Sequence, residues 1–371
     1  MKIGFDAKWF FDGPPSGRTV VVQHAQQLLA IQSDHDVYLF LDRRRRHLAF
    51  PFEHPRLHRV YVWADNNLLA NLWSVPRAAH RMGLDVVIFQ NFVPVWAHFA
   101  RVAFVYDVIF ESNPEYYTWR ERLYFRPLKL LSRRAERICT LSAAEKARIV
   151  RYKYGRPEVI DIVPLGVDQR FKPREAQDPS FLAELARRLH LPSRFLLFVG
   201  RLNIRKNLLN LLKAIALLRD QQIPLVIVGA RDWKMFDIDG LIDSLGIRVR
   251  VMFTGSLPEE DLRGVYALAT VFCFPSFEEG FGVPPIEAMA SGIPVVVSDR
   301  SSLPEICGSA GTYADPYQAA AIARAIDSLL GDPVLAARKR AEGLERARAF
   351  TWEASTQALL ESAVAAVGAM R

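Results

Sequence analysis

Short apolar runs alternate with helical stretches along the whole chain, and this alternation constrains the fold more than any other feature. The runs are KIGFDA, DVYLFL, DVVIF, RVAFVYDV, RICTLS and DIVPLG in the first half, and RFLLFVGR, PLVIVG, RVMFTG, VFCFPS and PVVVS in the second half. Runs of this length and composition predict buried strands, and helices between them predict parallel pairing through crossovers. The sequence therefore predicts an α/β chain with two doubly wound, Rossmann-like domains that face a central cleft.

The domain boundary is expected near the middle of the chain. The 371 residues are enough for two domains of ordinary size. The connection FKPREAQDPS is polar and carries prolines, as an interdomain linker does. We predict an N-terminal domain over residues 1–172 and a C-terminal domain over residues 185–350. The last helical segment, within residues 352–371, follows a complete second sheet and is expected to pack elsewhere.

The positive charge of the chain lies in its first half. Residues 1–180 contain 27 Lys and Arg against 19 Asp and Glu, whereas residues 181–371 contain 21 of each. The excess concentrates in Arg43 to Arg46 and in YYTWRERLYFRPLKLLSRRAER, which predicts a basic amphipathic helix kinked at Pro127. Such a helix is either a solvated surface helix or one that rests on anionic lipid, where each basic residue adds ~1 kcal/mol of attraction. Nucleic acid is disfavoured because the sequence has no recognition motif for it.

The sequence also bears on the compartment. The N-terminus MKIGFDAKWF lacks the apolar core of a signal peptide, and no apolar run approaches the ~18 residues of a spanning helix. Cys139, Cys273 and Cys307 have no CxxC spacing, so we expect buried thiols in a reducing cytosol. These features predict a cytoplasmic protein, peripheral on the inner face of a membrane if the basic helix binds lipid.

The stretch FEEGFGVPPIEAMA predicts a turn from a strand into a helix. Pro284 and Pro285 suit the first helical positions, so the helix is expected to begin there with Glu287 in its first turn. Gly280 and Gly282 let the backbone approach a ligand at the helix N-terminus, where unpaired N–H groups favour an anion. Carboxylates beside a phosphate would repel it unless they meet uncharged hydroxyls. A nucleotide-sugar, with phosphate in the middle and polyols at the ends, accounts for both features.

Two other loops carry candidate phosphate contacts. Arg201 and Lys206 follow the strand RFLLFVG and can converge on one anion, although Arg205 could take the place of Lys206. Gly17 lies in GPPSGRT, which lacks the glycine spacing and the lysine of a Walker loop. That loop is either a plain strand-to-helix turn or a segment that lines the cleft against the donor phosphates.

Acidic residues at strand ends allow more than one interpretation. Asp107 follows Tyr106 at the end of a strand and either binds a sugar hydroxyl or makes a buried cap. Asp34-His35-Asp36 and Asp237-Ile238-Asp239 have the DxD form, but neither stands directly after a strand, where a metal-dependent transferase needs it. We therefore predict no metal and no cofactor.

Taken together, GRLNIRKN, VMFTG, FPSFEEGFGVPPIEAMASGIPVV and VPLGVD resemble family-4 retaining glycosyltransferases of the GT-B fold, notably the bacterial mannosyltransferase-like members of exopolysaccharide and O-antigen assembly. The Glu-x7-Glu signature of that family matches Glu279 and Glu287. The resemblance implies transfer of a hexose, foremost mannose from GDP-mannose, onto a lipid-diphosphate-linked oligosaccharide. A UDP-sugar donor and a non-catalytic nucleotide-sugar binder are the alternatives. A nicotinamide-dependent oxidoreductase is disfavoured because GxGxxG is missing.

The resemblance also implies residue roles. Glu287 would bind the ribose hydroxyls, Glu279 the transferred sugar, and the final helix would cross back to the first domain. Tyr106 stands where many members have a histidine assigned to the donor sugar; its pKa near ~10 makes it a poor base, but it can donate a hydrogen bond. The expected catalytic residues are Asp107, Arg201, Lys206 and Glu279. The expected donor-binding residues are Gly17, Tyr106, Phe253, Thr254, Gly255, Gly280, Phe281, Gly282, Val283 and Glu287.

Overall fold

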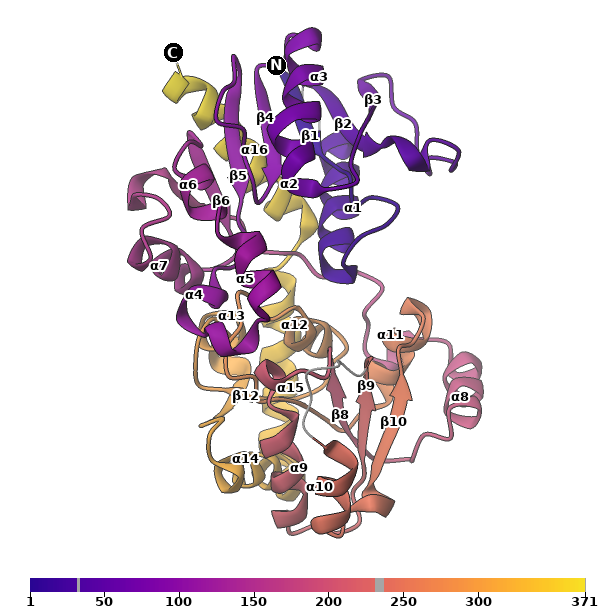
Figure 1. The fold of residues 1–371 in the computed structure, drawn as a ribbon. Coiled ribbons are helices and arrows are strands. Elements are labelled where there is room, and N and C mark those ends of the chain that lie inside the picture. The colour runs from indigo at the N-terminus through magenta and orange to yellow at the C-terminus, as the bar shows by residue number, and fades with distance from the viewer. Residues whose placement is uncertain (32–33, 231–236, 371) are drawn as a thin grey trace. The chain divides into compact units, whose positions relative to one another are not determined.

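The computed structural model describes residues 1–31, 34–230 and 237–370 and divides into two compact units (Figure 1). The first unit is Met1–Gly166 together with Thr351–Arg371, and the second unit is Val167–Phe350. Arg371, the last residue of the predicted final helix, lies outside the described residues.

The change from the first unit to the second comes a few residues before the predicted boundary at 172. The backbone N–H of Val167 donates to the carbonyl of Phe350 at 3.0 Å, which closes the second unit on itself. Phe171 packs edge-on against Tyr266 with 5.5 Å between ring centroids. Val167 and Phe171 therefore contact residues of the second unit, to which they also belong in the division of the chain.

The first unit contains a seven-stranded sheet in the order β3-β2-β1-β4-β5-β6-β7, and its pairings are parallel. Its strands are β1 (Lys2–Asp6), β2 (Asp36–Asp42), β3 (Leu57–Val62), β4 (Val86–Gln90), β5 (Ala100–Phe104), β6 (Arg137–Thr140) and β7 (Ile160–Ile162). The chain moves outward from β1 to β3 and then returns to the other side of β1. The topological switch point therefore lies between β1 and β4.

Helices cover both faces of this sheet. They are α1 (Pro15–Ala30), α2 (Asn67–Leu69), α3 (Val75–Met82), α4 (Ile109–Ser112), α5 (Trp119–Phe125), α6 (Leu128–Ser132), α7 (Ala143–Arg151) and α16 (Trp352–Met370). Val87 and Phe89 share a core with α3, α6 and α7 on one face. On the other face α16 packs on α1, β4, β5 and β6, and the α1 residue His24 lies 5.8 Å from the Phe104 ring. The return of the final helix to the first unit, drawn in yellow in Figure 1, is confirmed.

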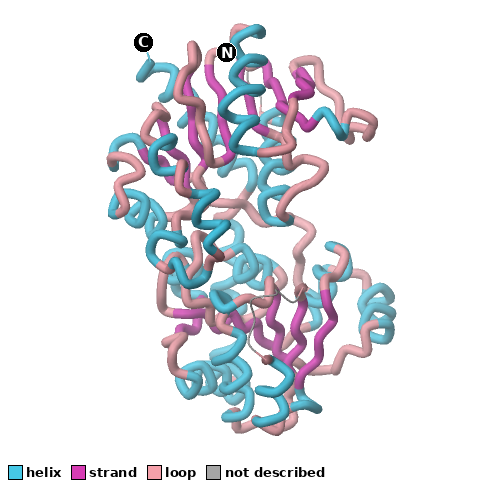
Figure 2. Tube along the Cα trace, in the orientation of Figure 1, coloured by secondary structure: helices cyan, strands magenta, loops and turns pink. Residues whose placement is uncertain are grey.

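The second unit repeats the design with a six-stranded parallel sheet in the order β10-β9-β8-β11-β12-β13. Its strands, magenta in Figure 2, are β8 (Leu196–Val199), β9 (Leu225–Val228), β10 (Val251–Gly255), β11 (Val271–Phe274), β12 (Val295–Ser298) and β13 (Gly311–Ala314). Here the switch point lies between β8 and β11. The predicted α/β class, with two Rossmann-like domains, is confirmed.

The helices of the second unit also lie on both faces of the sheet. They are α8 (Pro179–Arg188), α9 (Leu208–Leu217), α10 (Ile238–Ser244), α11 (Glu259–Leu268), α12 (Val283–Ala290), α13 (Leu303–Cys307), α14 (Ala319–Gly331) and α15 (Pro333–Arg348). Helices α9, α10 and α14 build one core, whereas α12 packs against α11, α13 and α15. Short 3-10 turns connect these elements in both units, and one π-helical turn, η2 (Ala70–Ser74), precedes α3.

Two strands were not predicted from the sequence. In β3 the side chains of His58 and Arg59 are exposed, and the strand lies at the edge of its sheet, so it lacks the apolar run of a central strand. Strand β13 is a second edge strand of four residues that begins with Gly311. Both edges therefore escape a prediction built on continuous apolar runs.

The basic stretch of the first unit does not form the single amphipathic helix that the sequence predicts. It forms α5 and α6, which meet at Pro127 as predicted, but its apolar residues do not share one face. Leu128 and Leu131 are buried in the core, while the side chains that face outward keep 57–64% of their surface exposed. These exposed apolar residues are Trp119, Leu123 and Leu130.

The four-arginine run after β2 is partly neutralised. Arg44 pairs with Asp42 at 2.6 Å and with Asp65 at 2.9 Å, and Arg45 pairs with Asp12. Local acidic residues therefore reduce the positive field that the sequence predicted there. Across the parts of the chain that the structure describes, no helix combines the length and apolarity needed to cross a bilayer.

Candidate functional site

The candidate site of the second unit lies at its topological switch point. One side is the segment that follows β8 and the other is the loop from Pro275 to Gly282 between β11 and α12. Asn207 links the two sides, because its side-chain amide donates to the carbonyl of Pro275 at 2.8 Å. The backbone N–H of Phe277 also donates to the Arg205 carbonyl at 2.9 Å. These bonds hold the glycine loop against the start of α9.

Glu279 is the centre of this site. Its Oε1 accepts from Nζ of Lys206 at 2.6 Å, and its Oε2 accepts from the Arg205 guanidinium at 2.8 Å. Lys206 also lies over the Phe274 ring at 4.6 Å. Burial opposes ionisation of Glu279, but Arg205 and Lys206 outweigh it and hold the pKa of this carboxyl below its ordinary value. The site thus carries a buried carboxylate and two cations.

This arrangement differs from the predicted pair of cations. The sequence predicts that Arg201 and Lys206 converge on one anion, with Arg205 as a possible substitute for Lys206. The structure brings Arg205 and Lys206 together on Glu279, and it places Arg201 in an exposed position directly after β8. Arg205 and Lys206 therefore contact Glu279 together, and neither takes the place of the other.

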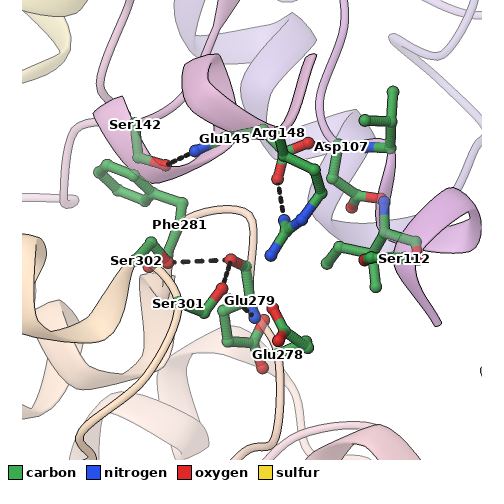
Figure 3. Close-up of polar contacts among 12 residues, drawn as sticks. Asp107, Ser112, Ser142, Glu145, Arg148, Glu278, Glu279, Phe281, Ser301 and Ser302 are labelled. Carbon is green, nitrogen blue, oxygen red and sulfur yellow. Dashed lines mark hydrogen bonds and ion pairs between the residues drawn. The ribbon is translucent and has the colours of Figure 1, made fainter. Parts of the chain in front are cut away.

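The loop before α12 depends on Gly282. Its φ of +118° is in the region that disfavours side chains, and a Cβ there would lie 2.7 Å from Cδ2 of Leu303. Ser301 and Ser302 fix the loop, since their hydroxyls donate to the Glu279 carbonyl at 2.6 and 3.1 Å (Figure 3). The Ser302 hydroxyl also donates to the Phe281 carbonyl at 2.6 Å. The glycine is thus required by backbone geometry.

Helix α12 begins at Val283, one residue before the predicted start, and this moves Glu287. The prediction that Glu287 lies in the first turn is wrong, because the helix has no acidic residue in its first turn. Glu287 accepts a 2.9 Å hydrogen bond from the Tyr266 hydroxyl. Burial raises the pKa of Glu287 to about 7, although the Tyr266 hydrogen bond works in the opposite direction. Its carboxyl therefore titrates near neutrality.

The residues expected near the base lie at the end of β10. This strand is at the edge of the sheet, and Phe253 packs against the core of α9, α10 and α14. The Thr254 hydroxyl donates to the Ile227 carbonyl at 3.4 Å, and Gly255 adopts a φ of +72°. Their contact with a base stays a prediction.

In the first unit, Tyr106 lies at the carboxyl end of β5, close to the switch point. Its hydroxyl donates to Oε1 of Gln90, the last residue of β4, at 2.7 Å. Its ring is 6.2 Å from the ring of Trp9. Gly17 serves the same packing, because a Cβ at that position would lie 2.9 Å from Cε3 of Trp9. A structural reason for Gly17 is therefore present, whereas its contact with phosphates stays a prediction.

Asp107 is part of an acidic pair that the sequence analysis missed. Its Oδ1 accepts from the backbone N–H of Ile109 at 3.3 Å, but Asp107 is half-buried and the N-cap of α4 is Val108, which has no side-chain cap. Its contact with a sugar hydroxyl stays a prediction. Glu145 is fully buried, accepts from the backbone N–H of Val108 at 2.7 Å and pairs with Arg148 (Figure 3). Burial and the charge of Asp107 raise the pKa of Glu145 to about 8, against the effect of Arg148.

A sequence signal for Glu145 was present. Ser142 and Glu145 have the S-x-x-E spacing of a helix N-terminus, and the Ser142 hydroxyl accepts from the Glu145 backbone N–H at 3.1 Å. The spacing finds the start of α7, but it does not show that the carboxylate turns toward β5.

The acidic DxD motifs have local partners. Asp34 pairs with Arg56 at 3.1 Å, Asp237 caps α10 through the N–H of Gly240 at 2.9 Å, and Asp239 pairs with Arg248 at 2.9 Å. Among the residues that the structure describes, no group of three or more His, Cys, Asp and Glu is placed to share a metal ion.

Comparison with known proteins assigns both halves of the chain. Residues 17–171 match the family model described as Glycosyltransferase Family 4, and residues 186–348 match the model described as Glycosyl transferases group 1. The O-antigen chain mannosyltransferase B of Escherichia coli is 32% identical over 257 residues, which are 68% of this chain and 66% of that protein. The MMP alpha-(1->4)-mannosyltransferase of Mycolicibacterium hassiacum is 32% identical over 250 residues, which are 65% of this chain and 57% of that protein. The matches thus span less than two thirds of the length of these relatives, 66% in one and 57% in the other.

Solved structures agree in fold over nearly the whole chain. Sucrose-phosphate synthase from Thermosynechococcus elongatus has a TM-score of 0.75 at 23% identity and covers 97% of this chain and 98% of its own. WaaG, a glycosyltransferase involved in lipopolysaccharide biosynthesis, has a TM-score of 0.73 at 18% identity and covers 98% of this chain and 99% of its own. At these identities the likeness concerns the fold. The matched models and the architecture together show that the chain belongs to the family 4 glycosyltransferases and has the GT-B fold.

Proposed function

We propose that the protein is a retaining, metal-independent hexosyltransferase that moves mannose from GDP-mannose onto a lipid-diphosphate-linked oligosaccharide in polysaccharide biosynthesis. Family membership and the mannosyltransferase names of two relatives support the reaction class and the sugar. The observation that carries the proposal is the contact of Glu279 with Arg205 and Lys206 at the switch point of the second unit.

The charges of this site suit a nucleoside diphosphate leaving group. Arg205 and Lys206 contribute two positive charges against the single negative charge of Glu279, and the N-terminus of α12 adds the positive end of a helix dipole, with backbone N–H groups at Gly282 and Val283. A diphosphate gains negative charge as the glycosidic bond breaks, and fixed cations in a partly buried site stabilise that charge. Glu279 is acceptor-only when ionised, so it suits hydroxyls of the transferred sugar.

The proposed chemical step uses these charges. The acceptor hydroxyl forms a bond to the anomeric carbon on the face that the diphosphate leaves, and the bond from that carbon to the phosphate oxygen breaks. The proton of the acceptor hydroxyl passes to the departing phosphate oxygen. No protein nucleophile takes part, so the chain supplies charge stabilisation and orientation.

The role of Glu287 is to bind the ribose. The Tyr266 hydroxyl donates to Oε2 of Glu287 and so holds the carboxylate in one orientation. Oε1 of the same carboxylate can then accept from a ribose hydroxyl. Vicinal ribose hydroxyls are donors, and a carboxylate accepts from them most strongly when it is ionised. The pKa of about 7 therefore couples nucleotide affinity to pH.

A basic surface of the first unit supports a membrane-bound acceptor. A hollow of about 590 Å³ is lined by Phe110, Glu111, Pro114, Arg122, Arg126, Lys129, Leu130 and Arg133. The exposed Trp119 and Leu123 stand on the same stretch of chain. Cations around exposed apolar side chains suit an anionic lipid surface, and we propose that the protein binds there peripherally, on the inner face of the membrane.

The alternative is a UDP-sugar transferase of the same fold. A solved structure of Anabaena Alr3699/HepE contains UDP and glucose, and at 19% identity it resembles this chain in fold with a TM-score of 0.73. A non-catalytic nucleotide-sugar binder is the second alternative. The nucleotide base that the protein prefers separates the first alternative from the proposal. Measurable turnover of the donor separates the second.

Calorimetric titration with GDP and with UDP tests the proposal. We expect GDP to bind and UDP to bind at least tenfold more weakly, an energy difference of about 1.4 kcal/mol. Preference for UDP would show that the donor is a UDP-sugar and not GDP-mannose. If neither nucleotide bound, the proposed nucleotide site would be wrong. Slow release of free mannose from GDP-mannose without acceptor is expected of an enzyme, and its absence would favour the binder.

A further inference from the structure

A second hollow in the first unit lies away from the switch point of its sheet. It has a volume of about 690 Å³ and opens between α3 and the segment of residues 91–99 that connects β4 to β5. Arg81 at the end of α3 and Arg101 in β5 place it near the amino ends of the strands, whereas doubly wound sheets bind their ligands beyond the carboxyl ends. The residues that line it are Pro76, Arg77, His80, Arg81, Val95, Trp96, Ala97, His98, Phe99 and Arg101. The hollow is therefore not the ligand site that such a sheet ordinarily has.

The walls of this hollow offer mainly hydrogen-bond donors. Arg77 and Arg81 are exposed on successive turns of α3, and the rings of His80 and His98 lie 5.1 Å apart between centroids across the opening. A guanidinium has five N–H donors and no acceptor, and an imidazole has at least one N–H. Of the described residues that line the hollow, none is acidic. Positive charge and forked donors of this kind suit a phosphate group.

Arg101 fixes the wall of the hollow that faces α3. Its guanidinium pairs with Glu136 at 2.6 Å and also donates to the carbonyls of Pro94 and Val95 at 3.2 and 3.1 Å. These bonds hold the backbone on which Trp96 follows. The wall is therefore in place before any ligand arrives, so that binding does not have to order it.

Two tryptophans stand exposed at the hollow. Trp96 keeps 85% of its surface exposed and Trp73 keeps 60%, and the neighbouring Val95 keeps 44%. The Arg77 guanidinium lies over the Trp73 ring at 3.5 Å, so a cation and an aromatic face are presented together. Exposed apolar groups that gather in this way mark an interaction surface. Tryptophan with arginine beside it is typical of the head-group level of a membrane, where one part of each side chain is apolar and the other is polar.

The hollow shares a face of the first unit with the basic surface of α5 and α6. Helices α3, α5 and α6 pack on the face of the sheet opposite to α16 (Figure 1). Tyr124 of α5 packs edge-on against Phe92, at the start of the segment that lines the hollow, with 5.3 Å between ring centroids. Helix α5 also carries the exposed Trp119 and Leu123. A bilayer can cover both surfaces at once, whereas a peptide in the hollow would leave Trp119 in water, so a membrane is the favoured occupant.

We propose that this hollow binds the phosphate of an anionic lipid head group and that Trp73 and Trp96 insert at the head-group level beside it. The first unit then lies on the membrane with the face of α3, α5 and α6. The inference rests on the membrane part of the proposed function and deepens it, because it adds a discrete lipid site and aromatic anchors to the general attraction of basic residues. Part of the binding should therefore survive high salt, which screens exposed charges but not apolar contacts.

Sedimentation with phosphatidylcholine vesicles that contain roughly one third phosphatidylglycerol tests the site. Arg77→Gln and Arg81→Gln should each weaken the partition about fivefold, and Trp96→Ala about tenfold. At high salt the arginine effects should shrink, while the Trp96→Ala effect should persist. Arg59→Gln is the matched control and should bind like wild type, because Arg59 is exposed but alternates with the core residue Val60 and so faces the other side of the sheet.

Lipids brominated in the acyl chain test the insertion of the rings. They quench the emission of a tryptophan that enters the bilayer and not of one inside the protein, such as the buried Trp352. Trp73→Phe and Trp96→Phe should each reduce the quenched part of the emission of bound protein. Soluble glycerol phosphate should not release the protein from vesicles, because the site needs the bilayer as well as the phosphate.

The outcomes separate this inference from the proposed function. If wild type binds anionic vesicles and Trp96→Ala, Arg77→Gln and Arg81→Gln all bind like Arg59→Gln, the inference is wrong while the surface of α5 and α6 keeps its role. Unchanged quenching in both phenylalanine variants, or release by glycerol phosphate, would also overturn it. If wild type ignores anionic vesicles, the membrane part of the proposed function fails as well. Binding of a polyglutamate peptide that Arg77→Gln abolishes would then assign the hollow to an acidic protein instead.

Discussion

The Nζ atom of Lys206 lies 2.6 Å from Oε1 of Glu279, and both side chains are buried. This contact joins the segment after β8 to the glycine loop before α12, so the pair has a structural role in addition to the chemical one. Buried charges are costly unless each keeps its partner, and Glu279 has a second partner in Arg205. Removing one of the two cations should therefore destabilise the protein, while the other still faces Glu279.

Lys206→Met should lower the free energy of unfolding by about 2–3 kcal/mol, below the usual range for a broken buried pair because Arg205 still faces Glu279. Urea unfolding measures the change. Lys213→Met, on the exposed face of α9, is the matched control and should shift stability by less than about 0.5 kcal/mol. Equal effects of the two substitutions would contradict the role of the pair.

Nucleotide affinity should rise with pH through neutrality. Ionised Glu287 is the better acceptor for ribose hydroxyls, and burial places its pKa at about 7. If only the ionised form binds, GDP should bind about tenfold more tightly at pH 8 than at pH 6. Calorimetry at several pH values measures this slope. Glu287→Gln removes the titration, and a variant that kept the full slope would assign it to another group.

The same carboxyl predicts a stability change of opposite sign. A folded pKa of about 7, above the ordinary Glu value of 4.5, means that the native state binds more protons than the unfolded state between these values. The free energy of unfolding should therefore fall as pH rises through that window, and Glu287 should contribute about 3 kcal/mol to the fall. Urea unfolding of wild type and Glu287→Gln at pH 5 and 8 isolates this share, because the other carboxyls, Glu145 among them, remain in both proteins.

Gly282→Ala should destabilise the second unit and weaken GDP binding. The substitution forces a φ of +118° on alanine and a Cβ 2.7 Å from Leu303, at a combined cost of about 2–3 kcal/mol. Thermal unfolding and calorimetry measure the two effects. Gly246→Ala is the matched control, since its φ is +66° but no atom lies within 4 Å of the new Cβ. It should cost about 1 kcal/mol and leave GDP binding unchanged.

Binding to anionic vesicles should depend on the exposed basic surface of α5 and α6. Arg122→Gln and Arg126→Gln should each weaken binding to vesicles with roughly one third phosphatidylglycerol by ~1 kcal/mol, and added salt should reduce the difference. Vesicle sedimentation measures the partition. Arg219→Gln, an exposed arginine of the second unit, removes the same charge and should have no effect. Binding that ignores lipid charge and salt would end the membrane proposal.

The central strands were predictable because each is apolar on both faces, as in β4, where every residue is buried. A short, continuous apolar run between two helices is best explained as a buried strand of a parallel sheet. The edge strand β3 was missed for the opposite reason, because solvent permits His58 and Arg59 there. The pattern of apolar residues therefore predicts buried strands well, but it misses strands that pair at the exposed edge of a sheet.

The candidate site was predictable only in part. The sequence pointed to Glu279, Glu287 and Lys206, because glycines and prolines mark the loop with Glu279 and the start of the helix with Glu287, and because both glutamates match the family signature. It could not show that Arg205 shares Glu279 with Lys206 or that Tyr266 contacts Glu287, since those partners lie on other elements and meet only after folding. Partner choice is a tertiary property.

Helix α16 has a consequence for how the chain acquires its structure during synthesis. It packs on β4, β5 and β6, and Leu359, Ala363 and Ala366 are fully buried there. All of Val167–Phe350 must leave the ribosome before that helix does, so the nascent first unit displays an uncovered apolar face throughout the translation of the second. The second unit, contiguous in sequence, can mature first, and the first becomes complete only when its last helix arrives.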